Sequence, residues 1–339
     1  MLLLLLSLVL SYKDIEYFNI CNRENNDKYN KKREQIIETI LNNEIPKDFY
    51  ENHQNTSRRW RELRKNLRNC VKNQFDEYND KYDNLIVISK GGRKHNYDFE
   101  FVFDNNYDEY KKIEFKFNCN LIDDTPQFSS PMKPSQYFIK TEEFIPFEEY
   151  YYDNYFLAIC ENSNLPIPSR ATYLKEINNN SPECLTEHKK LYKTNKQFAK
   201  FCKKQDFNAI KNYLKNNNFN LDVLNDYLYE KQKDKIYLLY KDGDFKFETK
   251  PREEYTILKE NIKIENKRVI CYTKSNKKIE IRLRFNNCLG LAFPGLAIKN
   301  IDRTAKELKE ICNDNNISYL SRITKAVLKQ KLIDNNIKF

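Results

Sequence analysis

Glycine is scarce in this sequence, with five residues among 339. Loops that cradle nucleotide phosphates need glycines at fixed spacing, and neither G-x-x-x-x-G-K-[ST] nor G-x-G-x-x-G occurs. The scarcity therefore argues against a P-loop NTPase and against the dinucleotide-binding fingerprint.

Metal-binding cysteine and histidine patterns are missing as well. The only histidines are His53, His95 and His188, and none of the nine cysteines form a C-x₂-C pair. The sequence therefore does not favour a structural zinc site. Scattered cysteines without a framework spacing suit a reducing compartment, so we expect an intracellular protein of the cytoplasm or nucleus.

Long apolar runs are also lacking, apart from the first ten residues, Met1 to Leu10. This stretch has the length of a signal-peptide core, but no basic residue precedes it and no small-x-small cleavage site follows it. It is too short to span a bilayer. We therefore expect no membrane partner. A secreted or membrane-associated protein remains an alternative, and it would require paired cysteines.

Aromatic and basic residues are abundant. The chain has 24 tyrosines, 22 phenylalanines and a formal net charge of +10. Its length allows two or three domains with a sizeable core, and the composition is globular. The positive charge favours a polyanion such as nucleic acid, although a lysine-rich solvated surface would explain it equally well.

The periodicity of apolar residues predicts an α/β (α+β) protein with a mixed-sheet core. Helices are expected first, including a basic one from Thr56 to Val71 that buries Trp60, Leu63, Leu67 and Val71. Three strands, a short helix and a buried strand should follow. The ranges of these last five elements are Leu85–Ile88, Tyr97–Phe103, Lys111–Asn118, Glu142–Tyr152 and Tyr155–Cys160.

The rest of the chain alternates in character. A mainly helical stretch is followed by a β-rich part with a hairpin around Lys241 to Asp244, and then by two short helices. The expected segments are an N-terminal helical part (1–57), a core (58–160), a helical connector (161–235), a β-rich part (236–300) and a helical module (301–339).

Polar residues gather on one face of the second and third strands. Phenylalanines occupy alternate positions of these strands, so the residues between them share the opposite face. A turn near Asn106 would place Asp98 across from Phe115 or Lys116. This register can bring Asp98, Glu114 and Lys116 together.

Two carboxylates and an ammonium in this arrangement suit phosphodiester hydrolysis. The carboxylates repel each other unless a hard cation such as Mg²⁺ lies between them. The cation would neutralise a phosphate and lower the pKa of water. Lys116 could orient that water or stabilise the charge of the transition state.

Asp98 followed by Glu114-Phe115-Lys116 resembles the PD-(D/E)XK nuclease superfamily, over about residues 58–160. The resemblance implies a restriction-endonuclease-like core, metal ligation by Asp98 and Glu114, and a catalytic role for Lys116. It implies Mg²⁺ as cofactor, with Mn²⁺ as an alternative. Tyr97 stands where the family often has proline.

Further polar residues could support such a site. Glu100 shares the face of Asp98 and could be a third metal ligand, and Glu62 is the candidate for a helical glutamate. His95 and Gln127 could assist, although a turn or loop role is the simpler interpretation. Four basic residues could bind nucleic acid near this site: Arg61, Arg64, Arg93 and Lys94.

The C-terminal tail is similar to SAP and SAP-like helix-extended-helix modules. Thr304-x-x-Glu307 forms a capping box, and Thr324-Lys325 begins a second helix that should bury Val327, Leu328 and Leu332. The resemblance implies contacts to the nucleic-acid backbone. The residues expected to make them are Lys309, Arg322, Lys325 and Lys329.

Together these patterns predict a Mg²⁺-dependent endonuclease that cleaves DNA and holds it with the tail. A nucleic-acid-binding protein of the same fold without catalysis is the main alternative. The sequence leaves open whether RNA is a substrate and whether the protein forms a homodimer.

Overall fold

The computed structural model describes residues 10–20, 26–78, 83–90, 95, 97–122, 127–129, 138–177, 182–249, 256–259, 262–266, 268–285 and 294–337. Its contacts divide the chain into two units. The first comprises Met1–Thr125 and Lys233–Lys250, and the second comprises Pro126–Gln232 and Pro251–Phe339. The chain therefore leaves the first unit after three strands and returns to it for two more.

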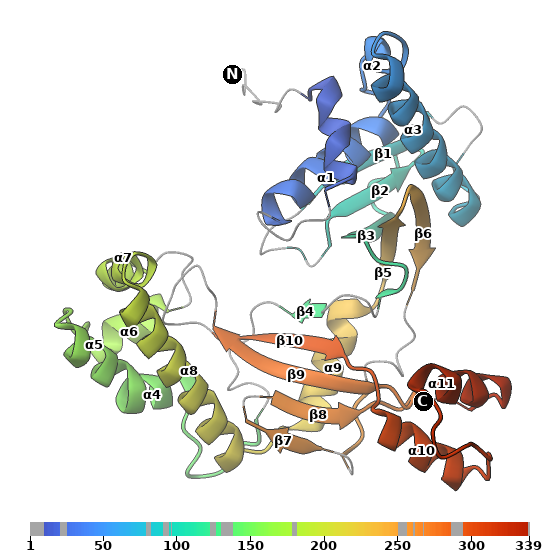
Figure 1. Ribbon diagram of the computed structural model, residues 1–339. Helices are drawn as coiled ribbons and strands as arrows, with labels where there is room; N and C mark the ends of the chain where they lie inside the picture. Colours follow the sequence, from blue (N-terminus) through green and yellow to red (C-terminus); the bar gives the residue numbers. More distant parts are fainter. Residues whose placement is uncertain are drawn as a thin grey trace. The chain divides into compact units, whose positions relative to one another are not determined.

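The first unit is built around a five-stranded mixed sheet of order β1-β2-β3-β5-β6 (Figure 1). The first three strands form an antiparallel meander, β5 runs parallel to β3, and β6 returns antiparallel to β5. Together with the helices, this sheet confirms the expected mixed α/β (α+β) class. The strands are β1 (Leu85–Ser89), β2 (Phe99–Phe103), β3 (Tyr110–Phe117), β5 (Lys235–Lys241) and β6 (Asp244–Glu248).

The prediction of a buried strand after the short helix is wrong. Tyr155–Cys160 is helical, divided between the π-helical segment η4 (Tyr152–Phe156) and α5 (Leu157–Ser163). A short apolar run cannot be assigned to strand or helix by periodicity alone. The hairpin expected in a separate β-rich part instead supplies β5 and β6 to the first sheet.

Helices α1 (Asn26–Leu41) and α3 (Gln54–Gln74) cover one face of the first sheet (Figure 1). The expected buried face of α3 is confirmed, because Trp60, Leu67 and Val71 have no exposed surface and Leu63 is 6% exposed. The indole of Trp60 also donates a hydrogen bond of 2.8 Å to the Tyr12 carbonyl, which ties the short helix η1 (Tyr12–Phe18) to α3. Helix α2 (Lys47–Glu51) precedes α3.

The second unit combines helices with a second five-stranded sheet of order β4-β10-β9-β8-β7. One core joins the helices to inward residues of β8 and β9, among them Cys271 and Ile279. No helix in the described part of the chain is both long and apolar enough to cross a bilayer. The helices are α4 (Phe147–Tyr151), α6 (Arg170–Glu176), η5 (Glu183–Leu185), α7 (Thr186–Thr194), α8 (Lys196–Asn216) and α9 (Leu221–Gln232). The strands are β4 (Gln127–Ser129), β7 (Lys263–Glu265), β8 (Arg268–Tyr272), β9 (Lys278–Phe285) and β10 (Pro294–Asn300).

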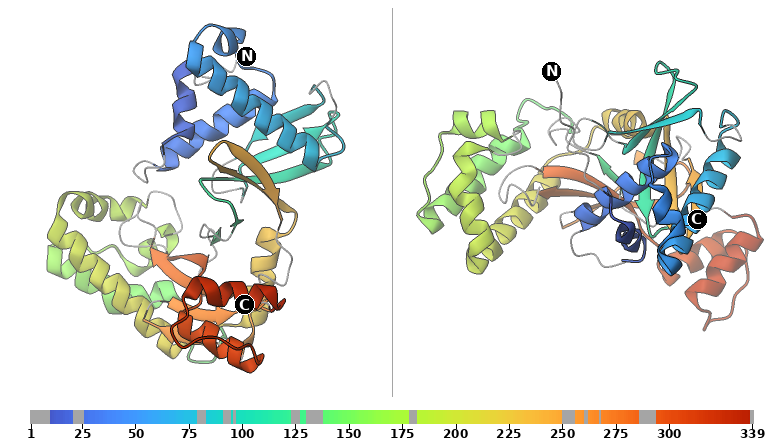
Figure 2. Two further views of the ribbon diagram at one scale, coloured as in Figure 1. Left: turned by 45° about the vertical axis from the view of Figure 1, so that its right-hand side comes forward. Right: turned by 90° about the horizontal axis from the view of Figure 1, so that it is seen from above.

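The C-terminal tail forms the two expected helices, α10 (Ala305–Asp314) and α11 (Lys325–Asp334), which pack against each other (Figure 2). The predicted capping box of α10 is present. Leu328 and Leu332 are fully buried, as expected. The expected burial of Val327 is wrong, because its position on α11 leaves it 47% exposed.

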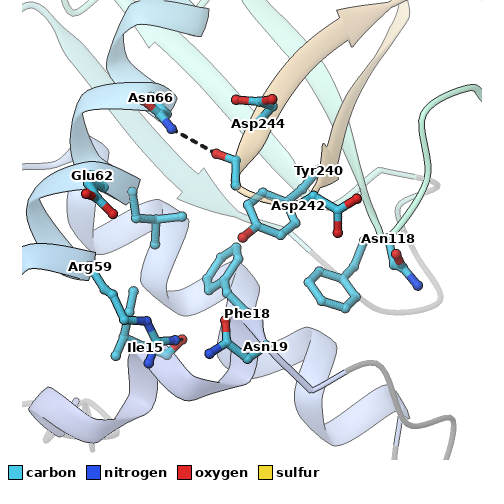
Figure 3. A pocket seen from close by; sticks show the side chains of 13 residues that line it. Ile15, Phe18, Asn19, Arg59, Glu62, Asn66, Asn118, Tyr240, Asp242 and Asp244 are labelled. Carbon is cyan, nitrogen blue, oxygen red and sulfur yellow. Dashed lines mark hydrogen bonds between the residues drawn. The ribbon is translucent and has the colours of Figure 1, made fainter. Parts of the chain in front are cut away.

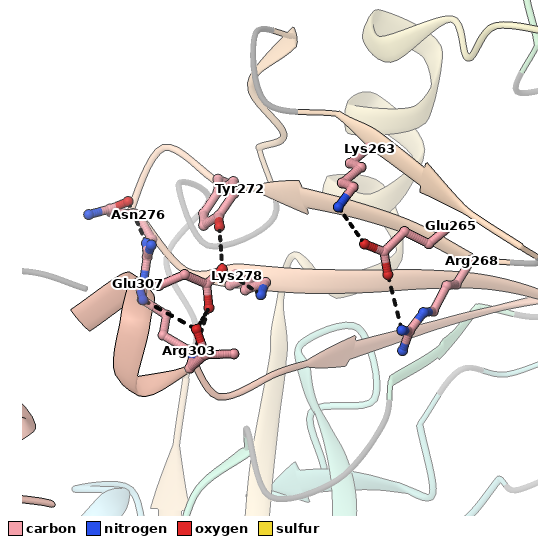
Figure 4. Close-up of polar contacts among 9 residues, drawn as sticks. Lys263, Glu265, Arg268, Tyr272, Asn276, Lys278, Arg303 and Glu307 are labelled. Atoms are coloured by element: carbon pink, nitrogen blue, oxygen red, sulfur yellow. Dashed lines mark hydrogen bonds and ion pairs between the residues drawn. The ribbon is translucent and has the colours of Figure 1, made fainter. Parts of the chain in front are cut away.

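Polar contacts hold α10 against the second sheet (Figure 4). The Glu307 carboxylate accepts hydrogen bonds of 2.6 Å from Lys278 and 3.0 Å from the Tyr272 hydroxyl. Burial alone would raise the pKa of Glu307, but the bonds from Lys278 and from the Thr304 amide lower it to about 2. Arg303 donates to the carbonyl and the side chain of Asn276. The tail is therefore fastened to the sheet of its own unit.

Candidate functional site

The register between β2 and β3 decides where Asp98 lies. The ladder ends at the pair of Phe99 and Ile113, and this register differs from the expected one, which put Asp98 opposite Phe115 or Lys116. The ladder is irregular at this step, because the Asp98 amide donates to the Ile113 carbonyl at 2.9 Å. The Asp98 carboxylate accepts a hydrogen bond of 2.8 Å from the Phe115 amide.

Glu114 is held by two lysines. The Lys116 ammonium contacts one carboxylate oxygen, Oε1, and the Lys235 ammonium contacts the other, Oε2. Burial alone would raise the pKa of Glu114, but both lysines lower it below its ordinary value. Burial would likewise lower the pKa of Lys116, yet Glu114 and Asp98 raise it. Glu114 is therefore a fixed anion between two cations.

Sequence reasoning missed Lys235. The residue begins β5, pairs in the parallel register with Lys112, and has a side chain that is only 4% exposed. Burial lowers its pKa below the ordinary lysine value, although the charge of Glu114 opposes this shift. No local signal links Lys235 to Glu114, since 121 positions separate them in the chain.

The helical glutamate near the site is Glu34 of α1. Burial and the charge of Asp98 raise its pKa to about 7, while the charges of Lys31 and Lys116 act in the opposite direction. Burial and the charge of Glu114 raise the pKa of Asp98 to about 6. These shifts indicate a cluster in which neighbouring carboxylates repel each other, and this repulsion favours their protonated forms. Glu62, the helical glutamate expected from the sequence, instead pairs with Arg58 at 2.8 Å.

Glu100 belongs to a neighbouring polar network. It is 7% exposed, accepts a hydrogen bond of 2.7 Å from the Tyr97 hydroxyl and lies 3.0 Å from the Lys90 ammonium. The His95 ring lies 3.2 Å from the same hydroxyl. Glu100 thus already has a cation and a hydrogen-bond donor, and its role as a third metal ligand stays a prediction.

The basic residues expected near the core have different surroundings. Arg61 is exposed and donates to the Tyr50 carbonyl, and the guanidinium of Arg64 lies 5.0 Å from the centre of the Tyr50 ring. Both arginines therefore pack against α2. Arg93 and Lys94 lie outside the described residues. Gln127 begins β4 of the second unit.

The basic residues of the tail lie on α10, on α11 and in the loop between them. Lys325 and Lys329 both contact the Asp302 carboxylate, at 3.4 and 2.9 Å. Lys309 donates to a backbone carbonyl of the loop at 3.0 Å, and Arg322 of the same loop is exposed. The four residues keep their predicted role as candidate phosphate contacts.

A cavity of about 630 Å³ opens in the first unit and is lined by residues of η1, α3, β3 and the β5–β6 hairpin (Figure 3). Phe18, Phe117 and Tyr240 form its aromatic part. Glu62 of α3 and Asp242 of the β5–β6 turn add acidic groups. Strand alternation separates this cavity from the carboxylate–lysine cluster, because Phe117 faces the helices.

No three His, Cys, Asp or Glu side chains among the described residues are grouped to hold a metal ion. No family model matches this chain, and no curated protein or solved structure matches it either.

Proposed function

We propose that this chain is a Mg²⁺-dependent endonuclease that hydrolyses phosphodiester bonds in DNA. The observation that carries the proposal is the cluster of Asp98, Glu114 and Lys116, joined by Lys235 and Glu34. Carboxylates beside fixed ammonium groups, on a rigid sheet, are the groups that phosphoryl chemistry requires. The resemblance to PD-(D/E)XK nucleases leads to the same activity.

The carboxylates fit a hard divalent cation. Mg²⁺ is usually bound through one or two carboxylates, with water and phosphate oxygens completing its shell. Asp98 would hold it, with Glu34 as the neighbouring carboxylate, because the charge of Asp98 acts on Glu34 and the pKa values of both side chains are raised. Once bound, the cation would neutralise phosphate charge and make water more acidic. Mn²⁺ prefers similar ligands and could replace it.

The chain's own residues would act on the substrate as follows. Lys116 would orient the attacking water or stabilise the negative charge that develops on the phosphate in the transition state. Glu114 would fix the position of Lys116 by their direct ion pair. The Phe115 amide would hold Asp98 in place through its 2.8 Å hydrogen bond.

The tail is proposed to bind the DNA backbone, as the resemblance to SAP-like modules implies. Exposed or half-exposed basic residues on and between its helices support this assignment. Such contacts would give affinity without sequence specificity. A DNA substrate and cysteines without a framework spacing together favour an intracellular site of action.

Nicking of supercoiled plasmid tests the activity directly. We expect the purified full chain to convert supercoiled plasmid to the nicked form with Mg²⁺ and to be inactive with EDTA, because the carboxylate cluster needs the cation. Gel shifts in parallel measure binding. Binding without cleavage under both conditions would favour the alternative of a non-catalytic nucleic-acid-binding protein.

Glu34→Gln should reduce Mg²⁺-dependent nicking by about 10–100-fold, the range seen when a group that supports a metal site is changed. The substitution keeps the shape of the side chain and removes its charge. Glu38→Gln is the matched control on α1, because Glu38 accepts hydrogen bonds from Ser89 rather than facing Asp98. Equal activity of the two variants would exclude Glu34 from the site.

A further inference from the structure

Lys235 occupies an unusual place in the cluster. Its side chain is 4% exposed, and the parallel pairing of β3 and β5 puts it on the same face as Lys112 and Glu114. Its ammonium also lies 5.4 Å from the centre of the Tyr237 ring, where a cation is attracted to the aromatic face. The Glu114 carboxylate and the Tyr237 ring therefore fix the position of the Lys235 ammonium.

The two oxygens of Glu114 are consequently both engaged. Lys116 contacts Oε1 and Lys235 contacts Oε2. Sites that hold two metal ions place them about 3.5–4 Å apart, and the two ions need shared oxygen ligands. At Glu114, the Lys235 ammonium already occupies the place where a second cation would contact the carboxylate.

We propose that Lys235 takes the place of a second divalent cation, so that this site binds a single cation at Asp98. The inference rests on the proposed metal-dependent function and specifies the number of ions that it uses. It also departs from the pattern of the PD-(D/E)XK resemblance, in which the acid at the position of Glu114 is a metal ligand.

Electrostatics favours this arrangement over metal binding at Glu114. A divalent ion on Glu114 would lie beside two ammonium groups, and like charges at that distance repel strongly where water is excluded. Displacing Lys235 from Glu114 would leave a buried, unpaired ammonium, which is costly. The Asp98 carboxylate, in contrast, accepts its hydrogen bond from the uncharged Phe115 amide.

Manganese binding measures the stoichiometry without any substrate. Free Mn²⁺ is followed by electron paramagnetic resonance as the full chain is titrated to millimolar Mn²⁺. We expect one ion per chain for the parent and two for Lys235→Met, because the neutral side chain frees one oxygen of Glu114. Lys235→Arg restores a cation and should bind one ion.

Lys112→Met is the matched control. Lys112 lies on the same face of β3, but its ammonium is 4.0 Å from Asp234 and is not paired with Glu114. This variant should bind one ion. Circular dichroism verifies that each variant is folded. The number of Mn²⁺ ions bound by the parent chain is measured without any variant.

The possible results separate the two proposals. Two ions in the parent, or one ion in folded Lys235→Met, would overturn the role of Lys235 and leave the metal-dependent function standing. A parent that binds no Mn²⁺ would instead overturn the metal-dependent function, and the present inference with it.

Discussion

Lys116→Ala is expected to lower the rate of plasmid nicking by about 10²–10³-fold, the loss seen when a donor that stabilises transition-state charge is removed. Lys116 is 19% exposed and held by Glu114, so its ammonium is presented in one position. Alanine removes that charge from the place where negative charge develops on the phosphate. Single-turnover nicking with saturating Mg²⁺ measures the effect on the chemical step.

Lys112→Ala provides the comparison for this substitution. The residue is a lysine on the same strand and the same face, and its ammonium is 4.0 Å from Asp234. Both variants remove one positive charge from β3, so a general loss of attraction for DNA would affect them alike. Nicking by Lys116→Ala at the parental rate would exclude this lysine from the reaction.

The hairpin that carries Asp98 and Glu114 could be predicted from local pattern. Phenylalanines at alternate positions assign one face to the core, and the polar residues between them must face the other way. The same logic predicts the buried stripe of α3, because leucine, valine and tryptophan recur at helical spacing. Strand alternation does not determine register, and the observed pairing of Phe99 with Ile113 differs from the register expected from the turn.

The remaining site residues could not be found in this way. Lys235 approaches Glu114 because β5 pairs with β3 after an excursion of the chain through the second unit. Glu34 of α1 feels the charge of Asp98, although 64 positions separate the two residues in the chain. Both contacts depend on tertiary packing, and neither residue belongs to a motif. Tyr155–Cys160 misled the strand assignment for a related reason, since an apolar run of six residues fits a buried helix equally well.

Leu67→Ala should reduce the free energy of unfolding of the first unit by about 2–5 kcal/mol, the usual cost of truncating a fully buried leucine. Leu67 has no exposed surface and lies in the core formed by α1, α3 and the first sheet. The cost combines the lost burial of the removed carbons with the cavity that they leave. Trp60, the only tryptophan of the chain, is buried two turns away in the same helix. Its fluorescence during urea unfolding therefore reports on this core.

Leu121→Ala is the control for this measurement. The same atoms are removed from a leucine of the first unit that is 48% exposed, so the loss should stay below about 1 kcal/mol. A similar shift of the urea midpoint in both variants would contradict the proposed core. A large shift of the urea midpoint for Leu67→Ala alone would support the packing of α3 against the sheet that carries Asp98 and Glu114. Because Glu114 and Lys116 alternate with the core residues Ile113 and Phe115, they face away from Leu67, and nicking below the unfolding transition should remain close to the parental rate.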